Sequence, residues 1–161
     1  MFERIFTFWV GEQIYGMPLL LVGEFCPSMQ ITPVEAVDDR ILGISHLRET
    51  SAVVLNMQRV LHKTEHSSSP LKDMIYVVPH ASLCDEAQAQ SLKSFDEPVV
   101  LAVDRLAEIL DVDPSLMHPT PAHLSEDFYD GVFDTEGGDL ILLNFSKLID
   151  FLLLELTEPQ R

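Results

Sequence analysis

Hydrophobic residues in this chain gather in short runs bounded by glycine, proline, aspartate and serine. Six runs are rich in Val, Ile, Phe and Tyr, a composition typical of β-strands: residues 5–10, 14–22, 52–57, 74–78, 99–103 and 140–145. Spacings of three and four residues, the period of a helix, are clear only from Ser146 onward. The pattern predicts a mostly β protein with one C-terminal helix, capped by Ser146 and ended near Pro159.

A weak internal repeat relates the two halves of the chain. Gly43 is followed twelve residues later by LNMQRVL, and Gly131 is followed twelve residues later by LNFSKLI. Upstream, VGEF at 22–25 matches LAEI at 106–109. We interpret these matches as a duplication of one structural unit.

The duplication predicts one domain over residues 1–161 with two related β subdomains. They are expected at about 12–62 and 71–156, separated by a polar linker over 62–70. Each half is too small to bury much surface alone, so we expect a shared core. Small barrels would also remove the exposed edge strands of each half.

Charge narrows the range of partners. The 161 residues include 26 acidic and 10 basic side chains, a net charge of −16, while 47 % are hydrophobic. Such a chain folds, and its surface repels nucleic acid and anionic lipid. The longest uncharged run, 13–23, is too short for a membrane span, and the N-terminus has no signal-peptide pattern. We therefore expect no nucleic-acid or direct membrane contact, and a cytoplasmic protein with Cys26 and Cys84 reduced.

Motifs of catalysis are absent from the sequence. It contains no Gly-x-Ser-x-Gly elbow, His-Glu-x-x-His pair or glycine-rich phosphate loop. His62 and His66 have the spacing of metal ligands on a helix, but they lie in a Ser-rich segment without a third ligand. The carboxylates of 134–139 lack calcium-loop spacing, and that segment predicts a hairpin turn. We expect no catalytic residue, metal or cofactor; the alternative is a small metal-dependent hydrolase using scattered His and Asp residues.

Two charged residues interrupt otherwise apolar or small segments. Glu24 follows the long apolar run, and Arg48 ends the segment GISHLR. Each is either an exposed charge at a strand end or a polar contact beside an apolar groove, where arginine often anchors a partner. The residues alone leave both interpretations open.

A family resemblance favours the binding interpretation. The segments that carry it are, in order, YGMPLLLVGEF at 15–25, GISHLR at 43–48, LAVDRL at 101–106, and YDGV at 129–132 with LLN at 142–144. In order and spacing they resemble the CheW-like adaptor domains of bacterial chemotaxis, over about residues 6–156. The resemblance implies an all-β fold of two five-stranded SH3-like barrels sharing one core, plus the C-terminal helix. It also implies a non-catalytic scaffold that couples the cytoplasmic tip of a chemoreceptor to the regulatory domain of a CheA-type histidine kinase.

The resemblance further implies which residues contact partners in a groove between the barrels. They are Val22, Glu24, Phe25, Ile44, Leu47 and Arg48. Apolar groove residues would take the stripe of a receptor helix, and the charges would set its register. The chain departs from the family pattern at His46 and Glu49, where Asn and Gly are expected. These departures leave open a divergent member, from a pili-associated or other alternative chemosensory system, that binds only one partner or competes for kinase sites.

Overall fold

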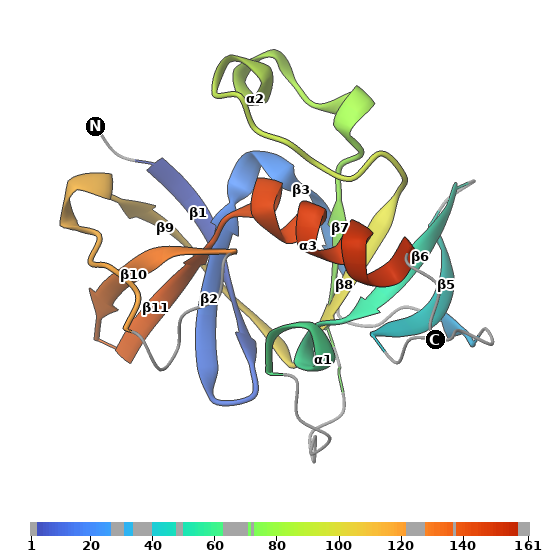
Figure 1. Cartoon of the computed structure of the whole chain (residues 1–161), viewed down its shortest axis with the longest axis horizontal. Coiled ribbons are helices and arrows are strands. Elements are labelled where there is room, and N and C mark those ends of the chain that lie inside the picture. The colour runs from blue at the N-terminus through green and yellow to red at the C-terminus, as the bar shows by residue number, and fades with distance from the viewer. Residues whose placement is uncertain are drawn as a thin grey trace.

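The computed structural model describes residues 3–26, 31–33, 40–47, 50–62, 71, 73–121, 128–136 and 138–157. The strands within them are β1 (Glu3–Val10), β2 (Gln13–Pro18), β3 (Val22–Cys26), β4 (Ile31–Thr32), β5 (Ile41–Leu47), β6 (Thr50–Asn56), β7 (Asp73–Val77), β8 (Val99–Val103), β9 (Arg105–Val112), β10 (Tyr129–Thr135) and β11 (Gly138–Leu143). The helices are α1 (Met57–His62), α2 (Asp85–Ala89) and α3 (Phe145–Thr157), with 3₁₀ turns η1 (Leu19–Leu21), η2 (His80–Ser82) and η3 (Pro114–Leu116). Figure 1 shows their arrangement.

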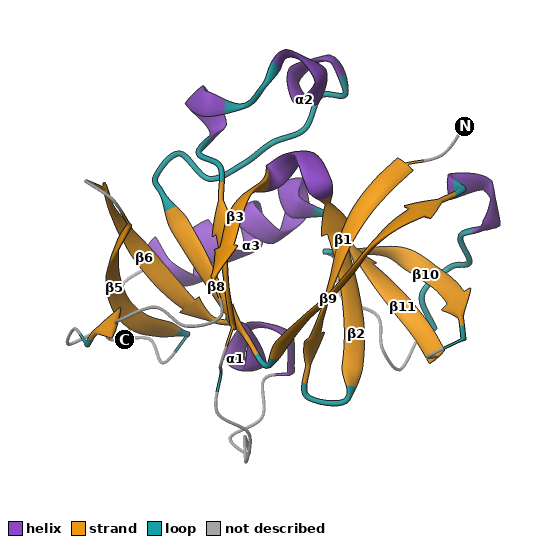
Figure 2. Cartoon of the chain, turned by 180° about the vertical axis from the view of Figure 1, so that it is seen from behind, coloured by secondary structure: helices purple, strands orange, loops and turns teal. Residues whose placement is uncertain are grey.

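The strands form two sheets, with α3 lying beside both of them (Figures 1 and 2). One sheet has the order β10-β11-β2-β1-β9, and the other has the order β3-β7-β8-β6-β5-β4. Among the described residues, the two outer strands of each sheet do not pair with each other, so neither sheet is closed by hydrogen bonds. The predicted mostly β fold with a C-terminal helix is confirmed, although one sheet has six strands instead of five.

Each sheet combines strands from both halves of the chain. The hairpin β1–β2 joins β9, β10 and β11, with β2 parallel to β11. The hairpin β7–β8 joins β3, β4, β5 and β6, with β8 parallel to β6. The boundary between the sheets therefore does not coincide with the predicted division at 62–70, because each half contributes its hairpin to the other sheet. Of the linker predicted at 62–70, residues 63–70 lie outside the described residues, and His62 ends α1.

The internal repeat is visible in the strand pairing. Gly43 on β5 lies opposite Val54, directly after an irregularity in the register. Gly131 on β10 lies opposite Leu142, also directly after an irregularity. Because sheet order, bulge position and register all recur, the duplicated sequence corresponds to a duplicated fold.

Both copies of the repeat end with a strand, an asparagine and a helix. The Asn56 side chain accepts a hydrogen bond from the backbone N–H of Gln58 at 3.0 Å, at the start of α1. The Asn144 side chain accepts one from Lys147 N–H at 3.1 Å, at the start of α3. Asn144 is therefore the N-cap of the C-terminal helix, and the prediction of Ser146 as its cap is wrong.

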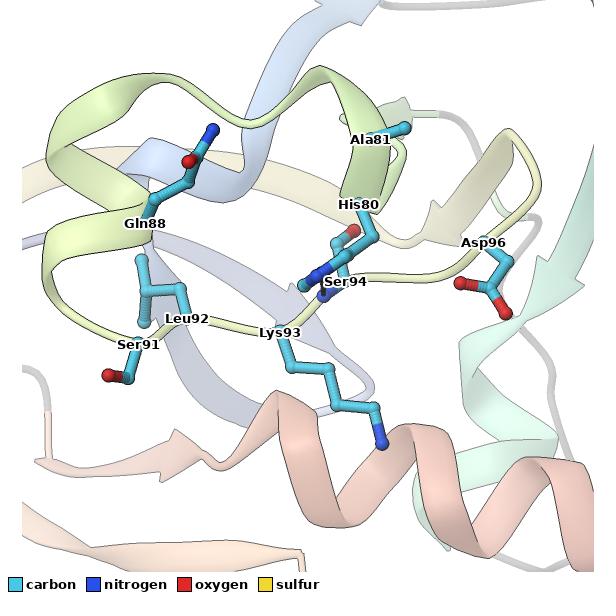
Figure 3. Close-up of a pocket in the computed structure, with 8 residues that line it drawn as sticks. All are labelled: His80, Ala81, Gln88, Ser91, Leu92, Lys93, Ser94 and Asp96. Carbon is cyan, nitrogen blue, oxygen red and sulfur yellow. Dashed lines mark hydrogen bonds between the residues drawn. The ribbon is translucent and has the colours of Figure 1, made fainter.

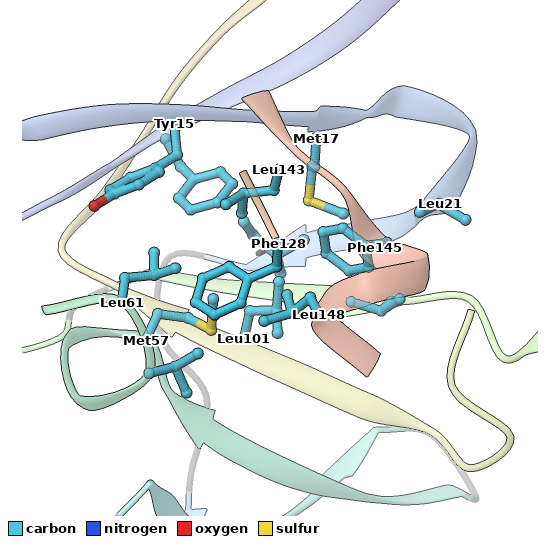
Figure 4. Close-up of a cluster of buried hydrophobic side chains, with 14 of the residues drawn as sticks. Tyr15, Met17, Leu21, Met57, Leu61, Leu101, Phe128, Leu143, Phe145 and Leu148 are labelled. Carbon is cyan, nitrogen blue, oxygen red and sulfur yellow. The ribbon is translucent and has the colours of Figure 1, made fainter. Parts of the chain in front are cut away.

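Among the described residues, three apolar clusters stabilise the two sheets. The largest lies between the sheets, and Figure 4 shows part of it, including Phe128, Leu143 and Leu148. Two smaller clusters lie on the opposite faces, one in each sheet. Strand β8 shows the division, because Leu101 faces the shared core and Val100 faces the smaller cluster of the six-stranded sheet. This burial on both faces explains why the segment appears in the sequence as an uninterrupted apolar run.

Several boundaries differ from the sequence prediction. The run 14–22 comprises β2, η1 and the start of β3, because Pro18 ends the first strand and has no N–H for further pairing. Strands β3, β4, β5, β9 and β10 were not predicted as separate strands; charged positions such as Glu24 and Glu108 obscure the apolar pattern there. The short helices α1 and α2 were also not predicted, since helices of about one turn leave little periodicity. The hairpin at 134–139 is confirmed, with Thr135 opposite Gly138.

Candidate partner-docking site

Strand β3 forms one edge of the six-stranded sheet and carries three of the predicted contact residues. Among the described residues it pairs only with β7. The register shifts at Gly23, where a Cβ atom would lie only 2.6 Å from the Tyr76 ring. Glycine at this position therefore lets the Tyr76 ring lie directly against the β3 backbone. The result is a bulged edge, a common feature where a sheet must re-aim side chains.

The three predicted residues of β3 occupy different environments. Val22 is half-buried and packs against the shared core. Glu24 is half-buried and lies opposite Tyr76 in the register. Phe25 lies opposite Ile75 in the register. The structure describes only the backbone of Phe25.

Strand β5 carries the other predicted segment. Ile44 is half-buried and lies between Thr32 on β4 and Val53 on β6. Leu47 ends the strand opposite Thr50, with only its backbone described. Arg48, the charged residue of this segment, lies outside the described residues, as does Glu49.

His46, one of the departures from the family pattern, makes a local contact. Its Nδ1 lies 3.0 Å from the Ser51 hydroxyl on the exposed side of the β5–β6 hairpin. The neighbouring Ser45 is completely buried, and its hydroxyl has no hydrogen-bond partner among the described residues. Histidine thus contributes to the hairpin where the family pattern has asparagine.

The two predicted segments do not lie side by side. Strands β7, β8 and β6 separate β3 from β5 in the sheet. Both overall views show β5 toward one end of the molecule and β3 near its middle (Figures 1 and 2). The described part of the chain therefore places Val22 and Glu24 on one flank of the sheet and Ile44 on the other.

Polar contacts outside the two predicted segments stabilise the fold. The Asp104 carboxylate accepts hydrogen bonds from the backbone N–H of Gly11 and from the side chain of Gln58, so it joins the β1–β2 turn to α1. Burial, with a smaller effect of Tyr129, raises the pKa of Tyr15 above its ordinary value.

Within the described residues, no three His, Cys, Asp or Glu side chains are placed to share a metal ion. His62 ends α1, and His66 lies outside the described part.

None of the described helices combines the length and the apolar character needed to cross a membrane.

A helical insertion that the sequence pattern did not predict lies between β7 and β8. Residues 78–98, which we call the cap, contain η2 and α2, whereas β1 and β2 are joined by only Gly11 and Glu12. The cap holds an open pocket of about 680 Å³ with a mixed polar and apolar lining, where Ser94 N–H donates to His80 Nδ1 at 3.3 Å (Figure 3). The unequal lengths of the two hairpin connections are the sequence signal for this insertion, and the sheet order identifies the two hairpins as equivalent.

A larger groove separates the cap from the five-stranded sheet. Its volume is about 850 Å³, and residues of β1, β2, η1 and α2 are among those that line it. Of the predicted contact residues, the three whose side chains the structure describes, Val22, Glu24 and Ile44, do not line this groove. The groove is therefore a second surface, distinct from these three residues.

Comparison with known proteins agrees with this duplicated architecture. The model of the CheW-like domain family matches residues 4–152, and the chain therefore belongs to that family. The crystal structure of the scaffolding protein TtCheW from Thermoanaerobacter tengcongensis matches with a TM-score of 0.69 and 21 % sequence identity. The match covers 89 % of each chain and shows a common fold. No curated protein matches this chain in sequence.

Proposed function

We propose that this protein is a non-catalytic cytoplasmic adaptor that couples a chemoreceptor tip to a CheA-type histidine kinase. The observation that carries the proposal is the family match over residues 4–152, together with the duplicated two-sheet fold. The solved relative with the same fold is described as a scaffolding protein. A scaffold needs surfaces that hold partners, and it needs no reaction centre.

The geometry favours two docking surfaces over one groove. The edge strand β3, with Val22, Glu24 and Phe25, forms the first; the end of β5, with Ile44 and Leu47 and the adjoining Arg48, forms the second. Three intervening strands separate them, so two partners could bind at the same time without overlap. Half-buried Val22 and Ile44 would supply apolar contact area, and the charged residues would discriminate between partners.

Charge reversal at each surface tests the proposal. Purified Glu24→Lys and Arg48→Asp variants would be assayed separately for binding to a receptor-tip fragment and to the kinase regulatory domain. We expect each variant to lose one partner, keep the other, and retain a thermal midpoint close to that of the parent protein. Glu108→Lys is the matched control, because Glu108 stands at the equivalent position of the repeat on β9 and is exposed.

Two outcomes would contradict parts of the proposal. Loss of the same partner in both variants would indicate one shared site, and unchanged binding in both folded variants would remove these residues from the docking surfaces. A reconstituted kinase assay then distinguishes an adaptor from a competitor. An adaptor raises receptor-coupled kinase activity, whereas a competitor that lacks receptor contact lowers it.

A further inference from the structure

The cap is an addition to one copy of the repeat. Strands β1 and β2 correspond to β7 and β8, because each hairpin occupies the same place in its sheet. Two residues, Gly11 and Glu12, join the first hairpin, while residues 78–98 join the second. The duplicated fold forms one hairpin without such an insertion, so the fold itself does not require the cap.

The cap is nevertheless well anchored. Ala87 on α2 is completely buried, and Leu83 is 4 % exposed. Lys93 Nζ lies 2.9 Å from Asp150 Oδ1, which ties the cap to α3, and Figure 3 shows the Lys93 side chain extending toward that helix. A surface formed by such a packed element is organised before a partner arrives, which lowers the entropic cost of binding.

Buried and half-buried apolar side chains line part of the groove beneath the cap, and we call them its floor. Its apolar lining includes Ile5, Leu19, Leu20, Leu92 and Leu142. These side chains come from β1, η1, β11 and the cap, so the groove exists only because the cap lies beside the five-stranded sheet. A volume of about 850 Å³ accommodates several apolar side chains of a partner.

The border of the groove is acidic. Within the part of the chain that the structure describes, four exposed carboxylates line it, from Glu3, Glu86, Asp111 and Asp130, against one guanidinium, that of Arg4. Arg4 Nε lies 3.2 Å from Asp111 Oδ1, so this cation already faces an acidic partner within the protein. The local excess of negative charge matches the net charge of −16 of the whole chain. It attracts cations and repels phosphate groups and acidic peptides.

We infer that this groove is a docking site for a cationic amphipathic segment of a partner protein. Apolar side chains on one face of the segment would fill the floor, and flanking Lys or Arg side chains would meet the carboxylates. The inference does not rest on the proposed adaptor contacts at β3 and β5, since the described side chains among them, Val22, Glu24 and Ile44, do not line the groove. Glu86 is the residue that links the groove to the cap, because it lies on α2 and contributes a negative charge to the groove.

A pair of synthetic peptides tests the chemistry. The first is a 14-residue Leu/Lys peptide with helical spacing, and the second has Glu in place of every Lys. Isothermal titration calorimetry with the full chain is expected to detect the Leu/Lys peptide only. Its affinity should fall as the ionic strength rises from about 0.05 to 0.5 M, because salt screens exposed charges.

Two matched variants test the location. Asp85 and Glu86 are both exposed in the first turn of α2, but only Glu86 lines the groove. Glu86→Lys should weaken binding of the Leu/Lys peptide about fivefold or more, whereas Asp85→Lys, with the same change in net charge, should change it less than about twofold. NMR spectra of methyl-labelled leucine should show shifts at Leu19, Leu20 and Leu92 on peptide addition. Leu116, 66 % exposed on η3 and outside the groove, should not shift.

Each contrary result overturns the inference. Equal weakening by the two lysine substitutions would show that binding follows net charge alone. Equal binding of the Leu/Glu peptide would show that the acidic border has no role. Absence of binding by the Leu/Lys peptide, or methyl shifts confined to leucines outside the groove, would exclude this groove as the site. Because the assay uses neither a receptor nor a kinase, its failure is separate from failure of the adaptor proposal.

Discussion

The glycine on β5 provides a sharp test of the duplicated architecture. A Cβ atom at Gly43 would lie 2.2 Å from the backbone oxygen of Thr32 and 2.9 Å from Ile31 Cγ2, and the residue has a φ of 156°. Because the closer obstacle is backbone, strand β4 must move by about 1 Å before alanine fits. That movement disturbs the pairing of both β4 residues with β5.

We expect Gly43→Ala to lower the free energy of unfolding by about 3 kcal/mol. Overpacking contributes about 1 to 3 kcal/mol, and weakened hydrogen bonds to β4 contribute about 1 kcal/mol. The repeat allows a second prediction at Gly131, the glycine equivalent to Gly43. At Gly131, a Cβ atom would lie 2.5 Å from Met117 Cγ and 2.7 Å from the backbone oxygen of His118. Its obstacles include a flexible side chain, so Gly131→Ala should cost somewhat less, about 2 kcal/mol.

Urea unfolding followed by tryptophan fluorescence measures both losses. Trp9 is the sole tryptophan, and its ring lies under Arg105, with the guanidinium carbon 4.7 Å from the ring centre. Gly138→Ala is the control, because φ is 118° there but no atom lies within 4 Å of the added Cβ. It should lose only about 1 kcal/mol, the cost of alanine at positive φ. If Gly43→Ala is no less stable than Gly138→Ala, close approach of β4 is not the reason for glycine at this position.

Two further predictions concern the core. Leu143 is 1 % exposed in the shared core, so Leu143→Ala should cost about 2 to 5 kcal/mol in the same unfolding assay, and a loss below about 0.5 kcal/mol would contradict its burial. Burial, and to a lesser extent Tyr129, raises the pKa of Tyr15 above the ordinary value of about 10 that it recovers on unfolding. The contribution of Tyr15 to the free energy of unfolding is fully present below about pH 10, and it is lost at up to about 1.4 kcal/mol per pH unit as the pH rises further. In Tyr15→Phe, the free energy of unfolding should therefore fall less steeply with pH above about 10. An unchanged slope in this variant would refute the assignment.

The candidate docking residues illustrate how far sequence reasoning reaches. Glu24 and Arg48 are candidates because each interrupts an apolar or small segment of the sequence, and the family resemblance implies that their neighbours also contact partners. Spacing along the chain carries no information about which strands become neighbours. The expectation of one groove therefore did not anticipate that β7, β8 and β6 lie between the two segments.

The acidic groove shows the same limit. Its lining combines residues such as Glu3, Leu20, Glu86 and Leu142, which are distant in sequence. No local pattern marks them as members of one surface. The unequal lengths of the two hairpin connections were visible in the sequence, but only the recognition that the hairpins are equivalent makes that difference informative.

By itself, the sequence indicated the fold class, six of the strand segments, the C-terminal helix and the duplication. Short apolar runs bounded by glycine, proline, aspartate and serine predicted a mostly β chain, and the matching LN segments after Gly43 and Gly131 marked two copies of one unit. The asparagines of those segments are now seen as helix caps. Only the tertiary structure decided that each copy contributes its hairpin to the sheet of the other, and that the cap borders an acidic groove. The physical reason is that side-chain period specifies which face of a strand is buried, whereas strand partners are selected by packing between residues far apart in the chain.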